Sequence, residues 1–223
     1  MAICSLGRGG AGTPQDSREY WEAFRKKVFR LLVMGYMRLD TKAYAGSEEP
    51  DITGELVKSI RLVAERSSSP KWAGQFAVHD DPPLNDGERR GKRRKRIDVE
   101  FELTSTRPHP RYCFEAKRLS GKTHRVSAYC GQEGMGEYLA GNYARDSHEA
   151  GMLGYVQTDT ADVWAKKLAS AIEANDAALS VTPDGRWAGV DVIAELDDTY
   201  CTKHDRPTVR KPITLYHLLL SFC

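Results

Sequence analysis

The sequence predicts a single α/β domain in which helices flank one β-sheet. Along the chain, segments whose apolar residues have helical spacing alternate with short segments that have the two-residue period of a strand. The 223 residues, of which 40% are hydrophobic, are enough to bury one full core. This alternation of helices and strands around one core is typical of α/β folds.

The central feature of the predicted sheet is a hairpin over residues 96–119. Its first strand alternates apolar and acidic residues, and the acidic face begins with Asp98. Its second strand has the same period, so Glu115 and Lys117 point to one side, because residues two apart on a strand share a face. Two prolines between the strands suit a connection and not a strand interior. The hairpin is therefore expected to bring two acids and one amine together.

Two carboxylates and a lysine in this arrangement fit the chemistry of phosphodiester hydrolysis. Mg²⁺ prefers hard oxygen ligands and is commonly held by one or two carboxylates with water and phosphate. Asp98 and Glu115 supply such carboxylates, and the backbone carbonyl of Ala116 supplies a further oxygen. Lys117 is suited to orient the attacking water or to stabilise charge on the phosphate. The alternative is a solvated strand face in a chain with 29% charged residues.

Asp98 on one strand and the string E-A-K at 115–117 on the next resemble the motif of the PD-(D/E)xK nuclease superfamily. Residues 96–97 depart from the literal motif, because Arg-Ile stands where a proline would precede the Asp. The string F-E-A-K-R-L resembles bacterial members that act in defence against foreign DNA. The resemblance implies a restriction-endonuclease-like α/β/α core with a central mixed sheet, preceded here by an N-terminal helix.

The same resemblance implies a metal-dependent endonuclease that cleaves DNA and leaves a 5′-phosphate and a 3′-hydroxyl. Its metal is expected to be Mg²⁺, with Mn²⁺ as a substitute, bound by Asp98, Glu115 and the Ala116 carbonyl. DNA is the expected partner, and RNA is the less favoured one. The alternative is an inactive nucleic-acid-binding or assembly subunit with the same fold. A chain of this size leaves little room for a specificity domain, so a partner protein or a homo-oligomer is expected.

A second predicted helix, from Pro50 to about Arg66, carries a further acidic candidate. In the nuclease superfamily the helix before the core hairpin often brings a glutamate to the metal site. Glu55 is the position that the resemblance implies for this catalytic role. The alternative is a helix-forming glutamate that faces water.

The strongest charge run lies immediately before the strand that carries Asp98. It contains seven basic residues around a single glycine: Arg89, Arg90, Lys92, Arg93, Arg94, Lys95 and Arg96. Such a segment beside a metal site favours phosphate contacts that do not depend on nucleic-acid sequence. The alternatives are a solvated loop and a nuclear-localisation signal.

The remaining elements extend the prediction to both ends of the chain. Residues 1–49 are expected to form a Gly-rich tail and a helix packed on a nuclease domain of residues 50–223. The other predicted elements are a helix over 16–36, strands over 71–79 and 150–157, a short helix near 134–143, a helix over 158–175, and closing strands over 190–196 and 213–222. His204 and Arg206 are interpreted as surface loop residues, with phosphate contact as the alternative. His217 is interpreted as a buried core histidine.

Composition excludes several other classes of protein. The five cysteines are scattered and form no C-x-x-C pair, which argues against a zinc ribbon or a disulfide scaffold and favours a reducing, cytoplasmic location. No apolar run approaches membrane-spanning length, and the first residues lack the apolar core of a signal peptide. The formal charge of +2 does not by itself indicate a nucleic-acid partner.

Overall fold

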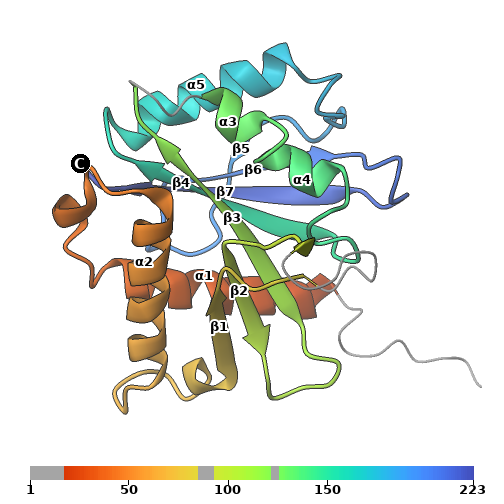
Figure 1. Cartoon of the computed structure of the whole chain (residues 1–223). Helices are drawn as coiled ribbons and strands as arrows, with labels where there is room; N and C mark the ends of the chain where they lie inside the picture. Colours follow the sequence, from red (N-terminus) through yellow and green to blue (C-terminus); the bar gives the residue numbers. More distant parts are fainter. Residues whose placement is uncertain (1–17, 85–92, 122–125) are drawn as a thin grey trace, which may run out of the picture.

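One mixed β-sheet with helices on both of its faces forms the body of the protein (Figure 1). The computed structural model describes residues 18–84, 93–121 and 126–223. The strands are β1 (Phe76–Asp80), β2 (Val99–Leu103), β3 (Arg111–Leu119), β4 (Glu149–Val156), β5 (Ala188–Gly189), β6 (Thr199–His204) and β7 (Ile213–Ser221). Their order in the sheet is β1-β2-β3-β4-β7-β6-β5. The neighbours β3–β4 and β4–β7 are parallel and the other pairs are antiparallel, so the predicted class of mixed sheet flanked by helices is confirmed.

Two groups of helices cover the two faces of the sheet. The α-helices are α1 (Arg18–Tyr36), α2 (Glu49–Ala64), α3 (Val126–Cys130), α4 (Met135–Leu139) and α5 (Ala161–Ala174), with short 3₁₀-helices η2 (Thr41–Tyr44) and η3 (Ala73–Gln75). The buried side chains of α1 and α2 share one core with the sheet, and those of α3, α4 and α5 share a second core on the other face. The N-terminal helix therefore packs on the same sheet as the rest of the chain. No helix in the described ranges has the length and apolar character needed to cross a membrane.

The long helices form where the apolar spacing predicts them. In α1 the side chains of Phe24, Val28 and Leu32 recur every four residues and are buried. In α5 the hydroxyl of Thr160 caps the helix by accepting a hydrogen bond from the Val163 N–H at 3.3 Å. Both predicted helices are confirmed, although residues 16 and 17 of the first lie outside the described residues.

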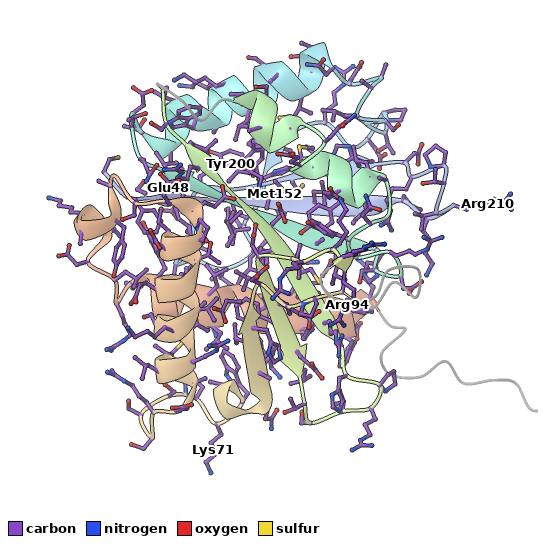
Figure 2. The ribbon with its side chains drawn as sticks, in the orientation of Figure 1. Glu48, Lys71, Arg94, Met152, Tyr200 and Arg210 are labelled. Atoms are coloured by element: carbon purple, nitrogen blue, oxygen red, sulfur yellow. The ribbon has the colours of Figure 1, made fainter. Side chains whose placement is uncertain are left out.

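β4 is the central strand of the sheet, and all of its residues are buried. Met152 lies inside the molecule, whereas Lys71 and Arg210 project from its surface (Figure 2). Gly151 faces Phe114 of β3, and a Cβ atom at position 151 would lie 2.1 Å from the Phe114 ring. A glycine is therefore required for β3 to lie this close to β4. This close packing fixes the strand that carries Glu115.

The C-terminal part of the sheet differs from the prediction. Residues 190–196, predicted as a strand, form no strand, and Val192, Ile193 and Leu196 instead pack into the core on the α1 side. β6, which pairs with β7, lies in the segment that was expected to be a connection. The reason is that a short apolar run indicates burial but does not specify a strand, while β6 buries polar residues.

His204 and Arg206 are buried, so their interpretation as surface loop residues is wrong. His204 Nδ1 lies 2.8 Å from the Leu179 carbonyl oxygen, and its Nε2 lies 2.6 Å from the Thr202 hydroxyl. The same hydroxyl lies 2.9 Å from Nε2 of His217, which is confirmed as a buried core histidine. The sequence pattern predicts that a polar residue in a polar segment is exposed. The hydrogen-bond partners that allow its burial lie in distant parts of the chain and cannot be seen in the local pattern.

Candidate active site

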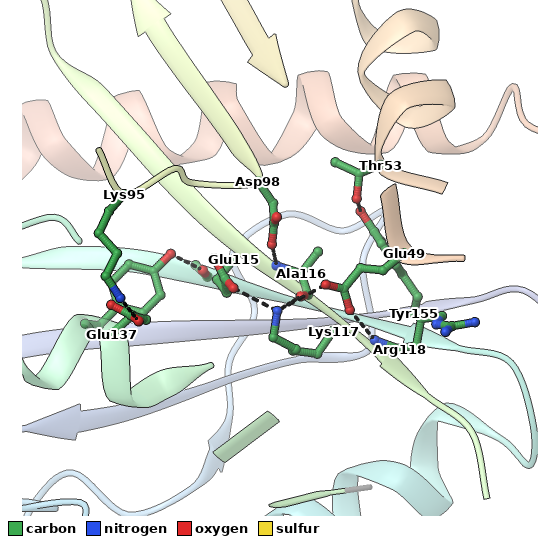
Figure 3. A network of polar contacts seen from close by, with 12 residues as sticks. Glu49, Thr53, Lys95, Asp98, Glu115, Ala116, Lys117, Arg118, Glu137 and Tyr155 are labelled. Carbon is green, nitrogen blue, oxygen red and sulfur yellow. Dashed lines mark hydrogen bonds and ion pairs between the residues drawn. The ribbon is translucent and has the colours of Figure 1, made fainter. Parts of the chain in front are cut away.

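Asp98 and Glu115 lie beside each other where β2 and β3 begin to separate (Figure 3). The register pairs Val99 with Phe114, which places Asp98, one residue before β2, opposite Glu115. One carboxylate oxygen of Asp98 accepts a hydrogen bond of 2.6 Å from the Ala116 backbone N–H. The hairpin therefore brings the two predicted carboxylates together, as the strand period indicates.

Lys117 is held by three oxygen atoms of the same site (Figure 3). Its ammonium donates to Glu115 at 2.8 Å, to the Ala116 carbonyl at 2.7 Å and to Glu49 at 3.1 Å. An ammonium has three N–H donors, so all of them have partners within the protein. The ammonium thus stands among oxygen atoms of the kind that also bind a metal cation.

The third carboxylate belongs to Glu49, in the first turn of α2, and not to Glu55. Six residues separate the two glutamates, which places them about 9 Å apart along the helix and about 120° apart around it. Glu55 pairs with Lys58 on the same helix and is 39% exposed. The expectation that Glu55 contributes to this site is therefore corrected in favour of Glu49.

The sequence pattern predicts that the second helix begins at Pro50, which leaves Glu49 outside it. The helix begins one residue earlier, and its first turn holds Glu49 and Asp51. Acidic residues are favoured at this end, where the helix dipole is positive, and proline is tolerated in the first turn. The acidic residue followed by a proline could therefore have indicated that the helix begins at Glu49. Its second oxygen accepts a hydrogen bond of 3.1 Å from the Arg118 backbone N–H, which joins the start of α2 to β3.

The acidic side chains ionise less readily here than in water. Burial, together with the neighbouring Asp98 carboxylate, raises the pKa of Glu115 to about 8, against the attraction of Lys117. Burial also raises the pKa of Asp98, although the Ala116 N–H opposes this change. Burial disfavours the charged form of Lys117, but attraction to Glu115 and Glu49 outweighs it, so the pKa of the ammonium is raised. Glu115 is therefore the member of the group that takes up a proton near neutral pH.

The residues present fit a divalent metal cation. One oxygen of Glu115 is buried and has no hydrogen-bond partner among the described residues. When ionised, the three carboxylates of Asp98, Glu115 and Glu49 carry more charge than the single ammonium of Lys117 neutralises. The Ala116 carbonyl oxygen has a second lone pair beside the one that accepts from Lys117. These hard oxygen donors are those that Mg²⁺ and Mn²⁺ bind.

Part of the basic segment lies beside this site, and Lys95 and Arg96 are already paired with carboxylates. Lys95 forms an ion pair with Glu137 of α4, and Arg96 lies 2.6 Å from the Asp81 carboxylate. Arg93 is exposed. Arg89, Arg90 and Lys92 lie outside the described residues, as does most of the loop before them. Phosphate contact by this segment stays a prediction, and it requires Lys95 and Arg96 to exchange partners.

Metal binding is expected to tighten as the pH rises towards 8. The pKa of Glu115 in the folded protein is above its ordinary value, so a proton must leave the carboxyl group when a cation binds below pH 8. One released proton corresponds to about a tenfold lower Kd for each pH unit. Calorimetric titration of the protein with Mn²⁺ and Mg²⁺ at pH 6, 7 and 8 measures this slope. Glu115→Gln is expected to remove the slope, and a pH-independent Kd in the wild type would contradict the assignment.

Comparison of the chain with models of protein families, with curated proteins and with solved structures finds no match. A functional assignment therefore depends on the chemistry of the residues that surround Lys117.

Proposed function

We propose that the protein is a metal-dependent endonuclease that hydrolyses phosphodiester bonds of DNA. The observation that carries this proposal is the convergence of Asp98, Glu115 and Glu49 around the Lys117 ammonium, with one Glu115 oxygen left without a partner. The mixed sheet flanked by helices is compatible with the restriction-endonuclease-like fold, which we propose as the finer description of the chain.

Asp98, Glu115 and the Ala116 carbonyl would hold the metal. When bound, Mg²⁺ or Mn²⁺ supplies a Lewis acid for the phosphate and lowers the pKa of a coordinated water. Asp98 is kept in orientation by the Ala116 N–H, which contacts its carboxylate at 2.6 Å. Glu115 lies on β3 and Asp98 directly precedes β2, so both carboxylates are attached to the sheet, which gives a more rigid site than a long loop would give.

Lys117 has the role of a positioned donor. In the resting arrangement its N–H groups are taken by Glu115, Glu49 and Ala116. When Glu115 turns to a cation, one N–H of Lys117 becomes free to donate to the attacking water or to a phosphate oxygen. Glu49 keeps the ammonium in place, because its own carboxylate is fixed by the Arg118 backbone. Glu49 is therefore a positioning residue.

DNA is the proposed substrate because the basic residues of segment 89–96 come just before Asp98 and β2 in the sequence. Exposed cations there, such as Arg93, would attract a polyanion toward the carboxylates and would make binding sensitive to salt. The proposal includes a role in bacterial defence, which the resemblance of the residues implies. It also includes action with a partner protein or as a homo-oligomer, which the small size of the chain suggests.

The rival function is a nucleic-acid-binding or assembly subunit that does not cleave. The observation that favours it is that all three N–H groups of Lys117 already have partners inside the protein. A closed network of this kind can serve stability alone. The two functions differ in whether DNA is cut when a divalent metal is added.

DNA cleavage assays on the wild type and a matched pair of variants test the proposal. Supercoiled plasmid and single-stranded oligonucleotides are incubated with the wild type, Glu49→Gln and Glu55→Gln, in Mg²⁺, in Mn²⁺ and in EDTA. The wild type is expected to cleave only with metal. Glu49→Gln is expected to lower the rate about 10- to 100-fold, the usual cost of losing a residue that orients a metal site. Glu55→Gln is expected to match the wild type, because Glu55 contacts Lys58 on the same helix. Salt-dependent binding without cleavage in either metal would favour the rival function.

A further inference from the structure

A second group of metal-ligating side chains lies on the outer part of the β1–β2–β3 sheet. His79 of β1 is the cross-strand partner of Glu100 in β2, and Glu100 is the partner of Cys113 in β3. Glu102 follows two residues after Glu100 and therefore shares its face. Ligand atoms of His79, Glu100 and Glu102 all lie within 4.8 Å of one another. Three strand positions thus direct one imidazole and two carboxylates to a common place.

Glu100 is a buried carboxylate with a weak donor and a distant cation beside it. It is 6% exposed, accepts a hydrogen bond from the Cys113 thiol at 3.8 Å, and lies 3.8 Å from the Arg111 guanidinium. Hydrogen bonds and close ion pairs to a carboxylate oxygen are ordinarily about 2.7–3.2 Å long. A buried charge is costly unless a cation or good donors compensate it. The position of Glu100 therefore calls for a positive charge nearer than Arg111.

Glu102 is oriented toward the same place. Its first oxygen lies 2.5 Å from Nδ1 of His109, and a contact of this kind fixes the direction of a carboxylate. Its second oxygen lies 3.9 Å from Nε2 of His79. This separation is too long for a hydrogen bond, but two atoms that each lie about 2.1 Å from one metal ion can be about 4 Å apart. In tetrahedral geometry the two atoms lie about 3.4 Å apart, so His79 and Glu102 would hold an ion after they approach each other by about half an ångström.

Arg111 is the competing occupant of this place. It lies 3.8 Å from Glu100 and 3.4 Å from Glu102, and it is the one side chain with a permanent positive charge seen at these carboxylates in the described part of the chain. Two carboxylates therefore face one guanidinium. Half of Arg111 is in contact with solvent, so its attraction is screened and the side chain can move outward.

We propose that His79, Glu100 and Glu102 form a binding site for a divalent transition metal, with Zn²⁺ as the best match. Imidazole nitrogen with carboxylate oxygen suits Zn²⁺, whereas Mg²⁺ prefers oxygen alone. Three protein ligands leave a fourth tetrahedral position for water. A bound ion would join β1 to β2 and would neutralise Glu100 in place of Arg111.

This site is distinct from the one around Lys117. Glu100 follows Asp98 by two residues in an extended segment, so their Cα atoms lie about 7 Å apart. Paired catalytic metals lie only about 3.5–4 Å apart, so the ion at His79 is not a second catalytic metal. The inference therefore does not depend on the proposed nuclease activity.

Zinc binding by three variants tests the site. Calorimetric titration with Zn²⁺ in saturating Mg²⁺ is done on the wild type, His79→Ala, Arg111→Gln and Asp98→Asn. His79 is 43% exposed, so its replacement leaves no core cavity, and thermal unfolding without metal checks that each variant is folded. The wild type is expected to bind one Zn²⁺. His79→Ala is expected to weaken binding at least tenfold, the lower limit seen when metal sites lose an orienting group. Arg111→Gln is expected to tighten binding, because it removes the competing cation.

Asp98→Asn separates this inference from the nuclease proposal. It is expected to lose Mg²⁺ binding and to keep Zn²⁺ binding with the wild-type affinity. Absence of zinc binding, equal affinity in the wild type and His79→Ala, or weaker binding in Arg111→Gln overturns the proposal. Loss of zinc binding in Asp98→Asn also overturns it, because the ion would then belong to the site around Lys117.

Discussion

Lys117→Ala is expected to lower the rate of metal-dependent DNA cleavage about 10²- to 10³-fold. Removal of one donor that stabilises charge in a transition state commonly costs this much. The same change leaves Glu115 and Glu49 without their common counter-charge, so the free energy of unfolding without metal is expected to fall as well. Mg²⁺ is expected to restore part of that stability, because it neutralises the same carboxylates. Nicking assays and thermal unfolding with and without Mg²⁺ measure the two effects.

Lys58→Ala is the matched control for this variant. Lys58 also pairs with a glutamate, Glu55, but on the exposed side of α2. Exposed pairs contribute little to stability, so neither cleavage nor unfolding is expected to change by a measurable amount. Wild-type cleavage by Lys117→Ala, or an equal loss in Lys58→Ala, would exclude Lys117 from the reaction. DNA binding is measured in parallel, since an intact affinity shows that the loss concerns the chemical step.

Arg206→Met is expected to lower the free energy of unfolding by about 3 kcal/mol, because hydrogen bonds to a charged group are each worth about 1.5–3 kcal/mol. Arg206 is 1% exposed and donates to the carbonyl oxygens of Lys211, Ala144 and Ser147 at 2.9, 3.0 and 2.7 Å. It thereby ties the loop before β7 to the loop before β4. For a protein of this size the change corresponds to a fall in Tm of about 6–12 °C.

Arg210→Ala in the same loop is the control for Arg206→Met. Arg210 is exposed and projects away from the body of the protein (Figure 2). Its replacement is expected to change the free energy of unfolding by less than about 0.5 kcal/mol, as is usual for surface positions. Scanning calorimetry of the two variants beside the wild type compares the losses. A Tm of Arg206→Met within 2 °C of the wild type, by the same scaling of about 2–4 °C per kcal/mol, would contradict the structural role of Arg206.

Much of the fold follows from local periodicity. Phe24, Val28 and Leu32 on α1, and Trp164 and Leu168 on α5, repeat at helical spacing because each helix covers one face of the sheet. β4 and β7 also agree with the predicted strands, since a central strand buried on both faces is mostly apolar. The local sequence is enough to predict these helices and strands, because their periodicity does not depend on distant contacts.

The errors have a common physical origin in contacts between distant segments. Glu49 and Glu55 are equally acidic in the sequence, and only the placement of α2 against β3 decides which of them reaches Lys117. His204 and Arg206 are polar, and their burial depends on carbonyl oxygens about 25–60 residues earlier in the chain. Asp98, Glu115 and Lys117 could be placed correctly because one hairpin contains all three.

The three contacts of Lys117 have a consequence for the order of events during binding. An ammonium seated among the carboxylates is a built-in competitor of any incoming cation, so free protein should load metal weakly. An arriving phosphate offers the ammonium a new anion to contact and releases the carboxylates. Nucleic acid and metal should then reinforce each other's affinity by the same factor, and the proposed nuclease would stay inactive until nucleic acid binds.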